Sequence, residues 1–431
     1  MLINPLPIII TLVGVYMLIK LRFFLLLHPL RTGRKLGEAL GHRSALRSLC
    51  LALAGTLGVG NVLGVCVGIS VGGAGSVFWM LVSAPFAAVL KYSEVTLSAD
   101  SRSRSDCGGA SFGGMFYVIK DRFRRLGAPL AVLYATGVLL LGLVMGAGLQ
   151  SNAVRGVTGG FLDTPPTVLG ALFALVIIFS VIKGAGIIEK ITAVVIPLTT
   201  IVYIAITSAV IIASSDRLVQ VIADIIDSAL TPLGAVGGAL GFLTMGAVRE
   251  GFCRGLLSNE AGAGTSGMAH AREGRLSPSS LGLMGVVEVV FDTVILCSLT
   301  AFAVLTALPE GVGSLSGMEL ILSAVVSTLG APLAHAVRLC VFLFAYSTVI
   351  CWYYYGCEAH RFLFGDRPPY LYFPLYTLFV FLGFLIDSAH LITLTDFLML
   401  ILTLLTCLTL IKSSDRIREL SELGGLIKLK R

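Results

Sequence analysis

Long apolar segments separated by short polar or basic connections run through the whole of this 431-residue chain. A helix of ~20 apolar residues is long enough to cross the hydrocarbon core of a bilayer. The pattern predicts an all-α integral membrane protein with about eleven transmembrane helices. The predicted spans are residues 5–27, 49–71, 74–98, 128–152, 166–184, 190–213, 229–257, 279–307, 332–362, 369–388 and 391–411.

Two of these apolar segments are interrupted by glycine. The first carries Thr56-Leu57-Gly58-Val59-Gly60-Asn61 at its centre, and the second carries Gly234, Gly237, Gly238, Gly241, Gly246 and Gly251. Glycine weakens a helix, and an unwound turn frees backbone groups to hold an ion or a polar ligand. Close helix packing against the glycines is the alternative explanation. The buried Asn and Thr of the first segment favour a transport site.

The interrupted segments divide the chain into two halves. With residues 1–30 set aside as an extra helix, five predicted spans fall in residues 49–213 and five in 229–411. Because five is odd, the second half must lie in the membrane inverted relative to the first. Inverted repeats with discontinuous helices are typical of secondary transporters. We therefore expect one transporter domain over residues 1–431, ending in a cytoplasmic tail over 412–431.

The composition agrees with a membrane protein. Hydrophobic residues make up 56% of the chain and charged residues 13%, against roughly 25% charged residues in soluble domains. Of the 31 Lys and Arg, only Arg155, Arg217 and Arg338 fall on one side of the predicted topology. The net charge of +7 therefore reflects the positive-inside rule and a lipid bilayer, not nucleic acid. This distribution predicts a cytoplasmic-membrane protein with its N-terminus outside and its C-terminus inside.

The sequence contains no pattern typical of an enzyme or a metal site. The nine cysteines are scattered without a CxxC pair, and the histidines lack metal-ligand spacing. A His-Glu-x-x-His motif and a nucleophile with its base are also missing, so we expect neither enzymatic activity, nor a cofactor, nor a transition metal. Glu288 and Asp292 lie in one span, where they predict either a structural or protonated pair or a second ion or proton site. The oligomeric state is left open.

The first interruption has the chemistry of a carboxylate site. Asn61 supplies an amide, Thr56 a hydroxyl, and the unwound backbone supplies N–H donors. Gln150 lies in an apolar span and needs a partner, either a ligand or a neighbouring helix. At the second interruption we expect carbonyls of residues 241–246 to accept from a substrate ammonium, with Phe242 or Met245 bounding the side-chain pocket. Neither interrupted segment shows an acid at mid-depth, which favours a zwitterion over a net cation.

Several motifs resemble those of the alanine or glycine:cation symporter family, the sodium:alanine symporters. The resemblance spans about residues 49–365 and rests on Gly58-Val59-Gly60-Asn61-Val62-Leu63-Gly64-Val65, Lys91-Tyr92-Ser93-Glu94, Arg254-Gly255-Leu256-Leu257-Ser258-Asn259-Glu260-Ala261-Gly262 and Phe344-Ala345-Tyr346-Ser347-Thr348. It implies a leucine-transporter-type fold with one extra N-terminal helix. It also implies sodium-coupled uptake of a small neutral amino acid such as alanine or glycine.

The resemblance also implies site residues. Thr56, Gly60, Asn61 and Gln150 match the family's substrate-binding positions, and the second broken helix adds a location at Phe242, Thr244 and Gly246. Ser347 and Thr348 stand where the broader fold binds sodium, and carbonyls near Ala54, Leu57 and Phe344 are expected to complete the shell. Val59 replaces the family's usual Thr, which leaves the choice of small amino acid open. A proton-coupled amino-acid transporter of the same fold, using Asp292 or Glu288, is the alternative.

Overall fold

The computed structural model describes residues 5–104, 111–159, 164–230, 246–308, 315 and 317–427. These residues form helices and loops, with one antiparallel pair of two-residue strands, β1 (Ser103–Arg104) and β2 (Ser111–Phe112). The predicted all-helical class is confirmed.

Helices occur in chain order as follows. The first half contains α1 (Leu6–Lys20), α2 (Phe24–Leu27), α3 (Pro29–Leu40), α4 (Arg43–Thr56), η1 (Val59–Asn61), α5 (Leu63–Gly72), α6 (Gly75–Asp100), α7 (Met115–Arg122), η2 (Arg124–Leu126), α8 (Gly127–Leu141), η3 (Gly142–Leu149), α9 (Gln150–Thr158), α10 (Pro166–Val181), α11 (Ala185–Ala213), η4 (Ser215–Arg217) and α12 (Leu218–Leu230). The second half contains α14 (Gly246–Ser258), α15 (Gly267–His270), α16 (Pro278–Val289), η5 (Val290–Cys297), α17 (Ser298–Ala307), α18 (Met318–Leu329), α19 (Ala331–Phe364), α20 (Tyr372–Leu382), α21 (Ser388–Lys412) and α22 (Ser414–Leu423).

The helices make this a multi-pass membrane protein. Among the described residues, six helical stretches are long and apolar enough to cross a membrane, or seven when the bent pair α4 and α5 is taken as one span. Shorter apolar helices α1, α10 and α20 occupy three more of the predicted segments. Part of the predicted span 229–257 lies outside the described residues. The count of about eleven spans therefore stays a prediction.

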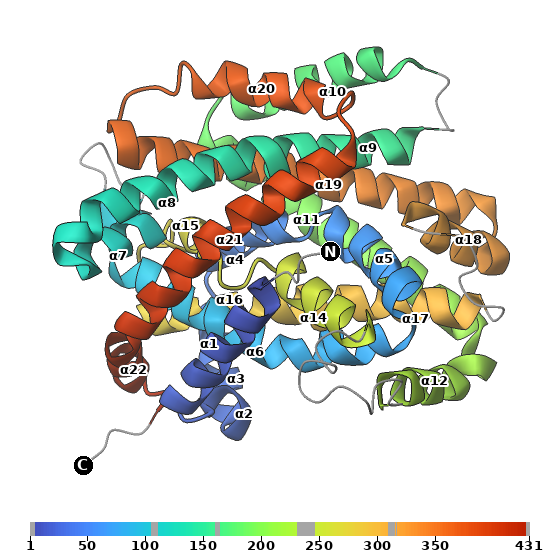
Figure 1. The fold of residues 1–431 in the computed structure, drawn as a ribbon, viewed down its shortest axis with the longest axis horizontal. Coiled ribbons are helices and arrows are strands. Elements are labelled where there is room, and N and C mark those ends of the chain that lie inside the picture. Colours follow the sequence, from blue (N-terminus) through green and yellow to red (C-terminus); the bar gives the residue numbers. More distant parts are fainter. Residues whose placement is uncertain are drawn as a thin grey trace.

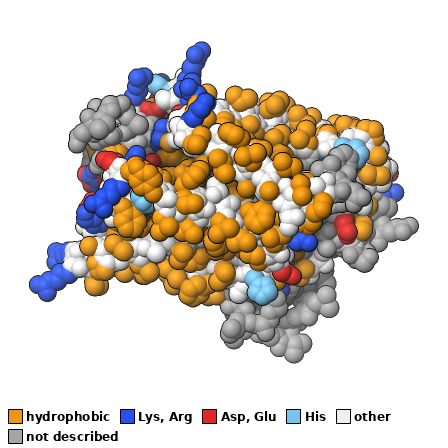
Figure 2. All heavy atoms as spheres, turned by 90° about the horizontal axis from the view of Figure 1, so that it is seen from above, with side chains coloured by type: hydrophobic (Ala, Val, Ile, Leu, Met, Phe, Trp, Pro, Cys, Tyr) orange, Lys and Arg blue, Asp and Glu red, His pale blue; other side chains and the backbone are white. Residues whose placement is uncertain are grey.

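The outer surface is suited to lipid. Phe179 on α10, Ile201 on α11 and Phe397 on α21 are each more than 60% exposed, and Figure 2 shows hydrophobic side chains over most of one face. A soluble monomer rarely exposes so wide an apolar surface. Most of the Lys and Arg visible on this face gather at its left end, which is the end where Figure 1 places α7 and α22. This segregation is typical of charged residues kept out of a hydrocarbon layer.

Helices α4 and α5 lie at the centre of the molecule, and the longest helix, α19, runs past them (Figure 1). Helix α6 packs against α14 and α16. Close approach needs glycine here, because a Cβ at Gly251 would stand 2.4 Å from the Ser76 carbonyl oxygen. Likewise, a Cβ at Gly255 would clash with the Ser83 hydroxyl. Gly251, one of the glycines assigned to the second break, therefore serves helix packing.

The tail after residue 412 begins with an ordered amphipathic helix. Helix α22 docks through Arg416, whose guanidinium donates to both carboxylate oxygens of Asp100 at the end of α6 (2.9 and 2.8 Å). At the start of α22, Asp415 pairs with Lys20 of α1 at 2.6 Å. The hydrogen bond from Lys20 lowers the pKa of the Asp415 carboxyl. Three separate helices are thus joined at the basic end of the molecule.

Candidate functional site

The first predicted break is present and is sharp. Helix α4 ends at Thr56, a single 3-10 turn covers Val59–Asn61, and α5 leaves at 66° to α4. The Leu57 amide still reaches the Leu53 carbonyl at 2.6 Å, but the Gly58 amide turns back to the Thr56 carbonyl at 2.8 Å. Gly58 takes an extended conformation with φ −101° and ψ −159°. The usual helical bonds are therefore lost over residues 58–62, as an ion or ligand site in a broken helix requires.

A cavity of about 170 Å³ opens beside this break. It is lined by Gly55, Thr56, Gly58, Val59, Gly60, Gly64, Met145, Leu149, Gln150, Arg254, Leu257, Ser258, Glu260 and Thr395. Of the residues predicted to bind substrate, Thr56, Gly60 and Gln150 line it together, although they come from two separate spans. Two larger hollows lie elsewhere, one between α10, α19 and α20 and one beside α12.

Gln150 and Thr348 both approach Gly58. The Val59 amide donates to Gln150 Oε1 at 3.5 Å, a long hydrogen bond. A Cβ placed on Gly58 would stand 3.1 Å from both Gln150 Oε1 and Thr348 Oγ1. Gln150 directly follows a π-helical stretch, η3, and such widened turns are frequent at functional sites. The break, the Gln150 helix and α19 therefore converge on one glycine.

Asn61 is not among the residues that line this cavity. Its Nδ2 donates to Asp292 Oδ1 at 2.5 Å, and its Oδ1 is buried without a hydrogen-bond partner among the described residues. Asp292 lies in the second π-helical stretch, η5, and also accepts from Ser258 at 2.8 Å and Thr293 at 3.0 Å. The amide predicted to bind substrate thus binds an acid in this conformation.

Glu288 and Asp292 do not form a pair. Glu288 accepts from Ser266 Oγ at 2.8 Å, lies 2.6 Å from His270 Nε2, and forms an ion pair with Lys91 at 3.5 Å. All four of these side chains are fully buried. The two acids are one helical turn apart in sequence, but they face different neighbours because α16 gives way to η5 between them.

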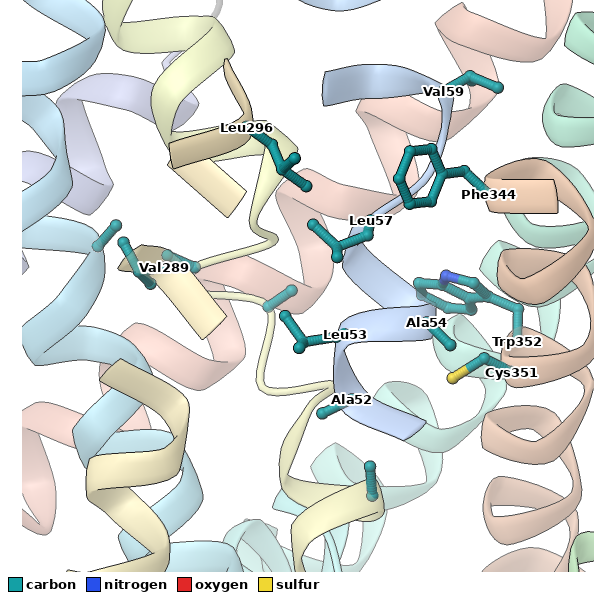
Figure 3. Close-up of a cluster of buried hydrophobic side chains, with 14 of the residues drawn as sticks. Ala52, Leu53, Ala54, Leu57, Val59, Val289, Leu296, Phe344, Cys351 and Trp352 are labelled. Atoms are coloured by element: carbon teal, nitrogen blue, oxygen red, sulfur yellow. The ribbon is translucent and has the colours of Figure 1, made fainter. Parts of the chain in front are cut away.

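The predicted sodium residues gather between α4 and α19. Ser347 Oγ and Thr348 Oγ1 both donate to the Phe344 carbonyl, at 2.8 and 2.9 Å. Serine and threonine in apolar helices commonly bond their own backbone in this way. Ala54, Leu57 and Phe344 are buried, and Figure 3 shows Ala54 facing Cys351 and Trp352 of α19, with Phe344 beside the break. The predicted residues come from two helices that pack together, and the hydroxyls of Ser347 and Thr348 are bonded to the backbone of α19 itself.

Phe242 and Thr244, predicted for the second broken helix, lie outside the described residues. Gly246, predicted with them, begins α14 and lies beside Val71 and Gly72 at the end of α5 farthest from the first break. The described chain unwinds further along, over residues 259–266 between α14 and α15. Glycine spacing alone did not point to this segment, although it contains two glycines with positive φ, Gly262 (88°) and Gly264 (79°).

This unwound segment, residues 259–266, is held by a buried acid on α6. Glu94 accepts from the Gly262 amide at 2.6 Å and from the Gly264 amide at 3.2 Å. Glu94 and its neighbour Lys91 are both fully buried, and Lys91 bonds Ser266 of the same segment. A carboxylate that accepts two backbone N–H groups replaces the helical bonds that the segment has lost.

The second unwound segment also brings charge to the cavity. Glu260 and Arg254 line it beside Thr56 and Gln150. Neither interrupted segment shows an acid at mid-depth, but Glu260, just beyond the predicted span 229–257, brings an acid to the cavity lining. Thr395 on α21 is a further lining residue that sequence patterns did not indicate.

The two unwound segments beside one small cavity belong to a chain that is similar to known transporters. The family model described as the sodium:alanine symporter family matches residues 1–420. The chain belongs to the sodium:alanine symporter family. An uncharacterized transporter of Haemophilus influenzae is 30% identical over 384 residues, 88% of this chain and 84% of that protein. The sodium/alanine symporter AgcS of Methanococcus maripaludis is 28% identical over 386 residues, 86% of this chain and 83% of AgcS.

The name of a third relative includes the proton as well as sodium. The putative sodium/proton-dependent alanine carrier protein YrbD of Bacillus subtilis is 32% identical over 325 residues, 72% of this chain and 65% of YrbD. The family is one of transporters and not of enzymes. Its description names sodium, which suggests Na⁺ as the coupling ion.

Proposed function

We propose that this protein couples inward movement of Na⁺ to the uptake of a small neutral amino acid, alanine or glycine, by alternating access. The observation that carries the proposal is the cavity of about 170 Å³, whose lining includes residues of two unwound segments from distant parts of the chain. Ligand pockets for drug-sized molecules measure roughly 300–1,000 Å³. A cavity well below that range suits a solute as small as alanine.

The proposed fold is the leucine-transporter type, with two inverted five-helix repeats after one extra helix and about eleven spans in a single domain. Helices α5 and α14 support it. They belong to the two proposed halves, and they pack antiparallel, because Gly246 at the start of α14 lies beside Gly72 at the end of α5. Opposite directions are what inverted repeats require. The proposed orientation in the cytoplasmic membrane has the N-terminus outside and the C-terminus inside.

In this mechanism the first break binds the substrate carboxylate. Thr56, Gly60 and Gln150 border the cavity, and α5 begins at Leu63 with its free amides and the positive end of its dipole toward the break. Sodium would bind between α4 and α19, where Ser347 and Thr348 exchange their bonds to the Phe344 carbonyl for bonds to the ion. Oxygen ligands without a fixed charge suit a hard monovalent cation.

Uptake of radiolabelled alanine into proteoliposomes tests the proposal. An inward Na⁺ gradient should drive saturable accumulation, and an equal K⁺ gradient should not. Ohmic, non-saturating flux would contradict a carrier. Absence of alanine and glycine uptake under every gradient would remove the proposed function.

Proton coupling is the second candidate. It is favoured by the contact between Asp292 and Asn61, because an acid bonded to a proposed substrate residue can carry a proton through the cycle. The name of YrbD also includes the proton. Uptake driven by a pH gradient and indifferent to Na⁺ would establish this alternative.

A further inference from the structure

Glu260 has an unusual backbone for its place in the structure. It lies in the second unwound segment, it is 3% exposed, and its φ is +54°. Residues other than glycine rarely adopt this conformation, and buried ones keep it only where the surroundings enforce it. Such positions are common in ligand sites. The strained backbone directs the only carboxylate among the cavity-lining residues to the space opposite the first break.

The neighbouring charged groups are already engaged. Glu94 accepts two backbone amides, Asp292 accepts from Asn61 and two hydroxyls, and Glu288 contacts Lys91 and His270. Arg254, the other charged residue of the cavity, pairs with Glu250 at 3.2 Å. Glu260 differs, because among the described residues its carboxylate accepts one hydrogen bond, from Thr265 to Oε2 at 2.7 Å. Its other oxygen, Oε1, is left for a ligand.

The two sides of the cavity have opposite polarity. Helix α5 begins at the first break and directs its positive end there, whereas α14 ends at Ser258 and directs its negative end to the same cavity. Glu260, two residues after the end of α14, adds an acidic side chain to the second side. A molecule with a carboxylate at one end and an ammonium at the other matches this arrangement.

We propose that Glu260 binds the α-ammonium group of the transported amino acid. This inference rests on the proposed amino-acid transport, because it assigns one end of the same substrate. It replaces backbone carbonyls by a carboxylate as the principal ammonium ligand. Thr265 is a positioning residue, because its hydrogen bond holds Oε2 and leaves Oε1 toward the cavity.

Binding of L-alanine and of L-lactate to the purified full-length protein tests the assignment. Lactate keeps the carboxylate and methyl groups but carries a hydroxyl in place of the ammonium. Glu260→Gln should weaken alanine binding about tenfold or more, as expected for loss of a charged hydrogen bond, and should leave lactate binding almost unchanged. Glu189→Gln is the matched control, because Glu189 pairs with Arg272 and does not line the cavity.

Three results would overturn the assignment. The first is an unchanged affinity for alanine in Glu260→Gln. The second is an equal loss of affinity for alanine and for lactate in that variant. The third is an unchanged ratio of the alanine and lactate affinities together with a shift in the Na⁺ concentration for half-saturation. The last would make Glu260 a ligand of the coupling ion. Should Glu260→Gln fail to fold, Glu260→Asp keeps the charge and must keep the preference for alanine, whereas Thr265→Val must reduce it. Failure of the wild-type protein to bind alanine would instead refute the proposed function.

Discussion

Alanine substitutions at Gly58 and Gly60 separate two roles within the first break. The two glycines are two residues apart, yet their surroundings differ. A Cβ on Gly58 would stand 3.1 Å from Gln150 Oε1, 3.3 Å from Gln150 Nε2 and 3.1 Å from Thr348 Oγ1. A Cβ on Gly60 would meet no described atom within 4 Å and would enter the cavity.

The distances set the expected sizes of the two effects. Contacts of 3.1 Å require Gln150 and Thr348 to move by a few tenths of an ångström, and such overpacking costs about 1–3 kcal/mol. Alanine also lowers the conformational entropy of the unfolded chain, which raises the free energy of unfolding by about 0.4–1 kcal/mol. Gly58→Ala should therefore lower the free energy of unfolding by up to about 2–3 kcal/mol. Gly60→Ala should leave it unchanged or slightly higher.

Transport should follow a different pattern. In Gly58→Ala, displacement of Gln150 and Thr348 disturbs the proposed substrate and sodium sites together, so the KM for alanine and the Na⁺ half-saturation should both rise, each roughly tenfold for a lost charged hydrogen bond. In Gly60→Ala, the added methyl narrows the cavity. Glycine uptake should then be retained better than alanine uptake.

Thermal unfolding in detergent and uptake into proteoliposomes measure these two quantities on the same preparations. Gly33→Ala, with no described atom within 4 Å of its Cβ and a position outside the cavity, is the control for substitution itself. Wild-type stability and wild-type kinetics in Gly58→Ala would show that Gln150 and Thr348 do not meet at this glycine, and the proposed convergence of sites would be wrong.

Substitutions test three further contacts. Asn61→Ala should abolish alanine uptake while folded protein remains, since Asn61 joins the first break to Asp292; wild-type uptake would exclude it from the site. Thr348→Ala should raise the Na⁺ concentration for half-maximal uptake, and an unchanged value would move the ion elsewhere. Lys91→Met should lower the free energy of unfolding by about 3–5 kcal/mol, because it leaves Glu288 without the ion pair to Lys91. Adding Glu288→Gln should restore most of that stability, as measured by thermal unfolding. If the double variant is no more stable than Lys91→Met, Lys91 and Glu288 are not coupled.

The first break could be predicted because its signals are local. Gly58, Gly60 and Asn61 fall within a few residues of one another in an otherwise apolar span, and each disfavours a regular helix on its own. The helical spans could be predicted for the same reason, since hydrophobic length is a property of the segment. The direction in which Asn61 points could not, because it depends on Asp292, which is far away in sequence.

Most of the predicted second break lies outside the described residues, and the described glycines that follow it serve two purposes. Gly251 fits the pattern of an interrupted span, but its lack of a side chain lets α14 approach α6. Gly262 and Gly264 supply the positive φ of the interruption seen among the described residues, which lies in a polar stretch that hydropathy assigns to a loop. Only the packing of α14 against α6 distinguishes these uses.

The buried acid on α6 also determines what the second break can offer a ligand. In the first break, the α5 end keeps amide donors free for an anion. In the second, Glu94 already accepts the Gly262 and Gly264 amides, so these donors are withdrawn from the cavity. What remains on that side is the Glu260 carboxylate and the negative end of α14. In the proposed site, Glu94 thereby sets the polarity without touching the ligand, and we expect a zwitterion to bind in one orientation only.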